Sequence, residues 1–145
     1  MTNNRLYAVL AYSGTLPFAA CALLLAARVP AIAGSGSWAE IAAGYGLAIA
    51  SFMAGTHWGA YLQQSAGAPL NLLLTSNAIT VVVWLTFVLA PIAVSLMVTG
   101  VAFLLLLLVD YRLASAGMIT SAYLVLRRNV TFVVVTLLTL TVVLA

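Results

Sequence analysis

The sequence predicts an all-α integral membrane protein, a single bundle of about five transmembrane helices. Hydrophobic residues make up 66% of the 145-residue chain, and only 5% of its residues are charged. A soluble domain carries roughly 25% charged residues. This chain therefore has too few charges to solvate a globular surface and needs lipid around most of it. Apolar runs of about the length that crosses a bilayer alternate with short polar or Pro/Gly-containing segments.

These runs place the expected helices within one domain covering residues 1–145, at about 6–27, 41–62, 70–89, 91–109 and 130–145. Pro69 stands at the start of the third, where proline is tolerated. The sequence LAPI, residues 89–92, divides a stretch that is too long for one span. Residues 114–126 are mildly apolar, which suits a helix lying along the interface. Asn129 is then a good N-cap for the last helix.

The first apolar run has two interpretations. Ala31-Ile32-Ala33 resembles the small-residue cleavage site of a signal peptide. The run is longer than the usual apolar core of such a peptide, and it contains Pro17. We therefore expect a retained helix, kinked where the proline removes a backbone hydrogen bond.

The arginines predict an orientation. Five spans put the two termini on opposite sides of the membrane. With the N-terminus inside, the inner side carries Arg5, Arg112, Arg127 and Arg128, and the outer side carries only Arg28. Because positive charge is retained on the inner side, we expect an N-in, C-out arrangement.

His57, the one histidine of the chain, lies inside the second expected span, ~8 Å from its inner end. Polar residues of other helices fall at a similar depth. The candidate pocket comprises His57, Asn77, Ser76, Tyr12, Ser13 and Thr56. An ionisable group within a membrane is a functional hypothesis by default, and the pocket would bind a proton, an anion or a small solute. The structural alternative is a hydrogen bond from His57 to Asn77 or Ser76 that fastens two helices.

The same helix carries a stripe of small residues: Gly44, Ala48, Ser51, Gly55 and Gly59. Their spacing of three or four residues puts them on one face, away from His57. Small residues let helices approach closely. We expect this face to pack against the first or third helix, with homodimerisation as the alternative.

Four charged residues return to the inner interface: Asp110, Arg112, Arg127 and Arg128. The simplest role is anchoring, in which arginine side chains extend to the headgroup region. The alternative is ion pairing that forms a gate for a lipid headgroup or an anion at the mouth of the pocket. A net charge of +3 is too sparse for a nucleic-acid surface.

Four segments carry a resemblance to a known family. They read YSGTLPF (12–18), YGLAIASFMAGTHWG (45–59), SNAITVVVW (76–84) and AYLVLRRNVT (122–131). In this order they resemble the domain of unknown function 3429 family, which includes the mitochondrial transmembrane protein 69. Ala122 departs from the pattern, because an aromatic residue is expected before Tyr123. The resemblance implies a bacterial inner-membrane location and a retained first helix, and it implies no activity.

The residues indicate function only broadly. The sequence shows no nucleophile–base pair, phosphate-binding loop or cluster of metal ligands. We therefore expect neither an enzyme nor a cofactor. The favoured hypothesis is an accessory or assembly protein of a larger, respiratory-type membrane complex, with lipid, that complex or a second copy as partners. The alternative is binding or transport of a proton, ion or small solute through the pocket around His57.

Overall fold

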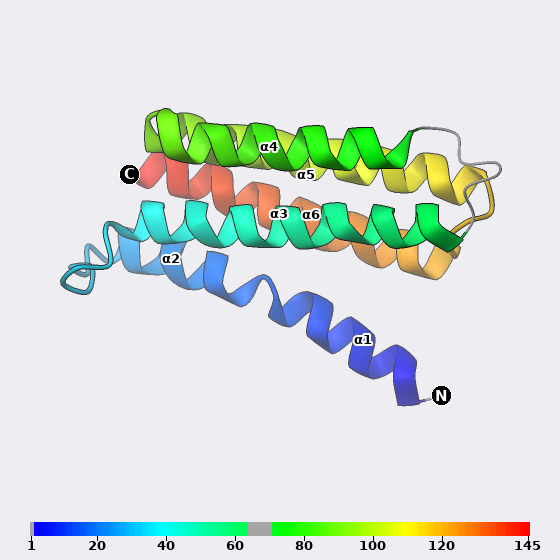
Figure 1. The fold of residues 1–145 in the computed structure, drawn as a ribbon. Helices are drawn as coiled ribbons and strands as arrows, with labels where there is room; N and C mark the ends of the chain where they lie inside the picture. The colour runs from blue at the N-terminus through cyan, green and yellow to red at the C-terminus, as the bar shows by residue number, and fades with distance from the viewer. Residues whose placement is uncertain (1, 64–70) are drawn as a thin grey trace.

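The computed structural model describes residues 2–63 and 71–145, and within these ranges the chain forms helices and no strands. The helices are α1 (Thr2–Ser13), α2 (Leu16–Ala26), α3 (Trp38–Gln63), α4 (Leu72–Leu89), α5 (Ile92–Ser115) and α6 (Ser121–Leu144) (Figure 1). The protein is thus an all-α bundle, as predicted.

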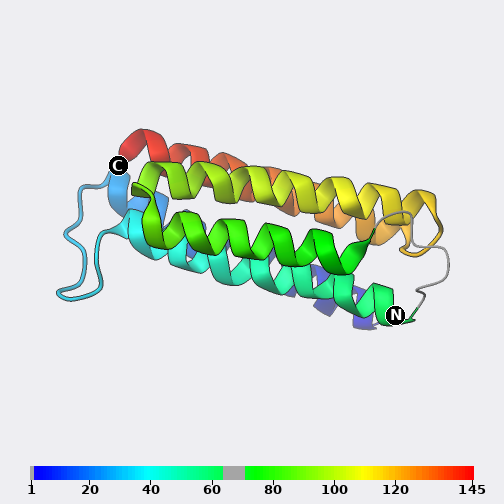
Figure 2. The ribbon, with the colours of Figure 1, turned by 45° about the horizontal axis from the view of Figure 1, so that its top comes forward.

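Helices α3 to α6 lie side by side along one axis, and each runs opposite to the one before it (Figures 1 and 2). The N-terminus and the turn between α5 and α6 lie at one end, which we call the amino end. The C-terminus, the loop before α3 and the turn between α4 and α5 lie at the other. The termini are therefore at opposite ends of the bundle.

Four segments are long and apolar enough to cross a membrane: Leu6–Ala26, Leu72–Leu89, Ile92–Ser115 and Ser121–Leu144. Helix α3 has 26 residues and runs alongside them (Figure 1). The outside of the bundle presents large apolar side chains, among them Phe52, Leu89 and Val143, each about two-thirds exposed or more. Such a surface suits lipid, because a water-exposed apolar patch of this extent is rare on soluble proteins.

The tightest packing lies on a small-residue face of α3. Its fully buried members are Ala39, Ala42, Ala43, Gly46, Ala50 and Ala54. Their small side chains leave room for the aromatic rings of Phe18 and Phe103, which pack against this face and contact each other edge to face. At Gly46 an added Cβ would lie 2.9 Å from Cγ2 of Thr99. The absence of a side chain there sets how closely α3 and α5 approach.

The first apolar run is not one kinked helix but two, α1 and α2, separated at Gly14 and Thr15. Pro17 lies in the first turn of α2, where its missing N–H costs least. The carbonyls at the break find partners: the Thr15 hydroxyl donates to the Tyr12 carbonyl at 2.8 Å, and the Tyr45 hydroxyl donates to that of Gly14 at 3.1 Å. From this break α1 diverges from α3 (Figure 1).

The last helix differs from the expectation. Helix α5 continues to Ser115 and α6 begins at Ser121, so the expected interfacial helix at 114–126 was wrong. Thr120 is the N-cap, accepting a hydrogen bond from the Tyr123 backbone N–H at 3.3 Å. Asn129, the expected cap, lies in the middle of the α6 sequence rather than at its start, and its side chain is exposed. The polar group Arg127–Asn129 interrupts the apolar pattern but not the helix.

Two other helix starts are set by local caps. Ser37 and Glu40 form a capping box: the Ser37 hydroxyl accepts from the Glu40 N–H at 3.2 Å, and the Glu40 carboxylate accepts from the Ser37 N–H. Helix α3 therefore begins at Trp38, three residues before the expected start at 41. Asn71 caps α4 by accepting from the Leu74 N–H. The expected first residue of this helix, Leu70, and Pro69 before it lie outside the described residues.

Candidate functional site

Asp110 joins two side chains from other helices. Its Oδ1 lies 3.0 Å from Nε2 of His57 on α3, and its Oδ2 accepts a hydrogen bond from Nε of Arg127 on α6 at 2.8 Å. All three residues are buried, with 1% of His57, 1% of Asp110 and 7% of Arg127 exposed. We call these three residues the polar cluster.

The polar cluster lies within about two helical turns of the amino end. His57 and Asp110 lie near the last residues of α3 and α5, and Arg127 lies near the first residues of α6. The helices α3, α5 and α6 therefore contribute one residue each at a common depth. The cluster fastens three helices, not two.

Charge within the cluster is balanced when His57 is neutral, since the Asp110 carboxylate faces the Arg127 guanidinium. Buried charges are stable only when paired in this way. The bond from His57 to the carboxylate requires a proton on Nε2, because an ionised carboxylate only accepts. In the neutral ring Nδ1 is then an acceptor, and it is buried with no partner among the described residues.

Arg127 is only partly satisfied. Its Nη1 contacts the sulfur of Met53, which is a weak acceptor. Its Nη2 is buried and has no partner in the described part of the chain. A guanidinium with an unused N–H group inside an apolar bundle is a candidate contact for a ligand.

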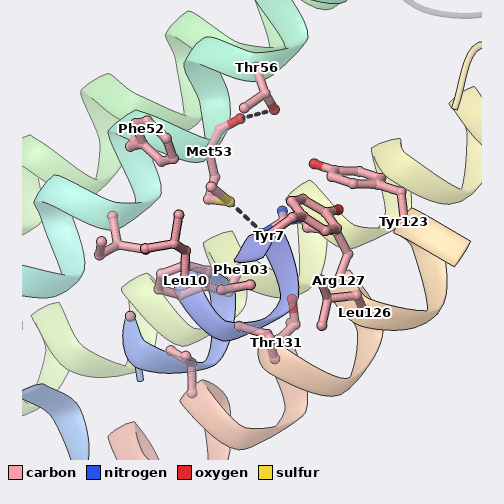
Figure 3. A pocket seen from close by; sticks show the side chains of 15 residues that line it. Tyr7, Leu10, Phe52, Met53, Thr56, Phe103, Tyr123, Leu126, Arg127 and Thr131 are labelled. Carbon is pink, nitrogen blue, oxygen red and sulfur yellow. Dashed lines mark hydrogen bonds between the residues drawn. The ribbon is translucent and has the colours of Figure 1, made fainter. Parts of the chain in front are cut away.

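A cavity of about 390 Å³ lies beside Arg127, between α1, α3, α5 and α6 (Figure 3). Most of its wall is apolar, and its polar contributors are Tyr7, Thr56, Tyr123, Arg127 and Thr131. The rings of Tyr7 and Tyr123 stack with their centroids 6.0 Å apart. The hydroxyl of Thr131 is buried without a partner among the described residues. Two wall residues, Arg127 and Thr131, thus carry unused polar atoms.

The expected pocket forms only in part. His57 is buried in the polar cluster, and Thr56 lines the cavity, with its hydroxyl donating to the Met53 carbonyl at 2.7 Å. Asn77 is exposed, and Ser76 donates to the Leu72 carbonyl of its own helix at 2.6 Å. The expected hydrogen bond from His57 to Asn77 or Ser76 was therefore wrong.

The two remaining pocket candidates, Tyr12 and Ser13, are exposed on α1. They lie at the end of α1 that precedes the break, and because both side chains are exposed neither belongs to the buried polar cluster. Only the carbonyl of Tyr12 has a described role, as the acceptor of the Thr15 hydroxyl.

The four charged residues expected at the inner interface divide into two pairs. Asp110 and Arg127 are buried and form an ion pair with each other, so anchoring at the interface was wrong for Arg127, and the gate for a headgroup or an anion stays a prediction. Arg112 and Arg128 are exposed at the amino end, as anchoring requires. The sequence reasoning missed the contact between Asp110 and His57, which are 53 residues apart.

Most of the small-residue stripe does not pack inside the bundle. An added Cβ at Gly55 or Gly59 would meet nothing within 4 Å, and Ala48 is exposed. Ser51 is half-buried, and Gly44 faces the Phe87 ring of α4 at 3.7 Å. The expectation of internal packing is therefore wrong for most of the stripe, because α3 turns its alanine face inward instead.

The family model described as "Protein of unknown function (DUF3429)" matches residues 3–143. The chain belongs to this family. The resemblance seen in the sequence is thereby confirmed, and His57, Asp110 and Arg127 all lie inside the matched region. No curated protein and no solved structure matches the chain.

Proposed function

We propose that this protein binds a small apolar or amphiphilic solute in the cavity beside the polar cluster, without catalysing a reaction on it. One observation supports this most: Arg127 and Thr131, two residues of a mostly apolar cavity wall, each carry a buried polar atom without a partner among the described residues. Its volume of about 390 Å³ falls in the range of small-molecule sites, which are typically apolar with a few polar groups.

Binding fits the geometry better than catalysis. Both carboxylate oxygens of Asp110 are engaged, and His57 is turned toward that carboxylate. Neither residue is among those that line the cavity. A general base must come within hydrogen-bond reach of its substrate, so the polar cluster is better suited to hold Arg127 in place.

We place the protein in the bacterial inner membrane with its amino end inside. Arg112 and Arg128 are exposed at the amino end, whereas Arg28 lies beyond α2 at the other end. The positive-inside rule favours this orientation. The cavity is then in the inner half of the membrane.

Filling the cavity tests the proposal. Ala11 lines it, and Ala20 is exposed on α2 outside it. In lipid nanodiscs, a diazirine-bearing octanol should label cavity peptides of the wild type on illumination. Ala11→Trp should reduce this labelling about tenfold, because the indole occupies the site. The control Ala20→Trp should leave it unchanged. Equal labelling of all three proteins would contradict the proposal.

A second candidate function is the accessory role, and the exposed stripe on α3 favours it. Open space at Gly55 and Gly59 would let a helix of a larger membrane complex approach the backbone closely. Gly59→Leu should then abolish co-purification of that complex from native membranes. Val101→Leu, at an exposed position on α5, should retain it. A wild-type protein that purifies without any stoichiometric partner would exclude this role.

A further inference from the structure

We infer that the ligand of this cavity is an anionic amphiphile, a carboxylate on an alkyl chain, and that His57 takes up one proton when it binds. The inference rests on the proposed binding function and assigns the chemical class of its ligand. Three features carry it: the unused polar atoms of two wall residues, the apolar remainder of the wall, and the charge of the polar cluster.

The donors fit a carboxylate. Both Arg127 and Thr131 line the cavity, and the Nη2 of Arg127 and the Thr131 hydroxyl, one turn further along α6, are buried without a partner among the described residues. A small rotation of the Arg127 side chain would turn its free N–H groups toward a bound carboxylate. Guanidinium groups bind carboxylates through two N–H groups at once. The second of these, Nη1, is held only by the sulfur of Met53, which lines the same cavity on a flexible side chain (Figure 3). A carboxylate oxygen is a far stronger acceptor than a thioether and would replace it.

The rest of the wall fits an alkyl chain. Ile49, Phe103 and Val134 line the cavity with apolar atoms only. Leu10 and Phe52 also line it, and they are 63% and 67% exposed on the outside of the bundle. The wall is therefore continuous with the lipid-facing surface, at the side where α1 diverges from α3. A chain can enter from the bilayer without crossing a polar barrier.

Charge balance implicates His57. With Asp110 ionised and Arg127 cationic, a neutral His57 leaves the cluster uncharged. A bound carboxylate would add one negative charge in an apolar surrounding, which is costly unless it is compensated. A proton on Nδ1 of His57, which has no partner among the described residues, restores neutrality.

Few other groups could take that proton. The titratable and charged groups that act on one another beside the cluster are Asp110 from α5, Arg127 and Tyr123 from α6 and Tyr7 from α1, and Tyr61 lies one turn from His57 on α3. The tyrosines are neutral near pH 7 and already carry their protons. Helix α4 contains no titratable residue. Both oxygens of Asp110 already accept hydrogen bonds, from His57 and Arg127, so Nδ1 of His57 is the free basic atom of the cluster.

Titration calorimetry of the protein in nanodiscs tests the inference with four probes: octanoate, octanesulfonate, octanol and acetate. Octanoate and octanesulfonate should bind at least about tenfold more tightly than octanol, which lacks the charge, and than acetate, which lacks the chain. Octanesulfonate does not itself titrate near neutral pH. Its binding, measured in buffers of different ionisation enthalpy, should therefore take up about one proton, and its affinity should fall as pH rises.

Variants separate the parts of the site. Asp110→Asn combined with Arg127→Gln removes both charges together and should lower octanoate affinity at least about tenfold. Arg128→Gln, the exposed neighbour, is the matched control and should have no effect. Thr131→Val keeps the shape and should weaken octanoate more than octanol. His57→Asn should abolish the proton uptake.

The outcomes distinguish this inference from the proposed function. If no octyl probe binds, the proposed function itself fails. If octanol binds as tightly as octanoate, or if Arg128→Gln weakens binding as much as the double variant, the cavity exists but does not recognise an anion, and the inference is overturned. Displacement of octanoate by palmitate placed in the nanodisc lipid would indicate a bilayer source, and its failure a water-soluble acid.

Discussion

Asp110→Asn should lower the free energy of unfolding by about 3–5 kcal/mol, because it leaves the Arg127 guanidinium buried without a counter-charge. Arg127 is only 7% exposed, so it cannot recover water without opening the bundle. The same change weakens the contact with His57. Denaturation of the purified protein in detergent micelles, followed by circular dichroism, measures the loss.

The double variant is the control for this prediction. Asp110→Asn with Arg127→Gln removes both charges, and replacing a buried ion pair as a whole is often nearly neutral. It should therefore recover most of the stability that the single change removes. A single variant as stable as the wild type would contradict the buried ion pair. A double variant no more stable than the single one would show that the loss does not come from an uncompensated charge.

Gly46→Leu should destabilise the bundle by about 1–3 kcal/mol or more, because the backbone of α3 is pressed against α5 at this point. Even a Cβ would lie 2.9 Å from the Thr99 methyl group and 3.6 Å from the Phe18 ring. Thr99 is fully buried, so neither neighbour can retreat without disturbing the core. The midpoint of detergent denaturation measures this effect.

Gly55→Leu provides the matched comparison, with the same change on the same helix. An added Cβ at Gly55 meets nothing within 4 Å, so the monomer should keep its stability. If Gly55→Leu were as damaging as Gly46→Leu, the face of α3 that packs inside the bundle would have been assigned incorrectly.

The sequence predicted the class of fold, because the apolar runs show roughly where helices form, although the break at Gly14 and Thr15 divides the first run into two helices. The predicted helix ends were wrong where a helix continues beyond its apolar run. The fourth run ends at Val109, so Asp110 was expected at the interface. Helix α5 continues to Ser115 and holds Asp110 inside, 1% exposed. A charged residue can lie within a membrane span when an opposite charge on another helix neutralises it. Hydropathy is read along one segment of sequence and contains no information about that partner.

The rotation of each helix about its own axis was the second feature that the sequence did not predict. His57 was singled out correctly as a buried polar residue, but its partner was sought on the third expected helix and lies on α5. Two small-residue faces of α3 had similar spacing. Packing chose the alanine face with Gly46 and left Gly55 exposed. Alanine and glycine are both small enough for close approach, so spacing alone could not separate the two faces.

The most direct test of the central claim, that the cavity beside Arg127 holds a small molecule, is native mass spectrometry of the protein released gently from its own membranes. The wild type and Ala20→Trp should each carry one bound amphiphile, and Ala11→Trp should carry none. A wild-type protein free of any such molecule, or the same molecule retained by Ala11→Trp, would contradict the claim.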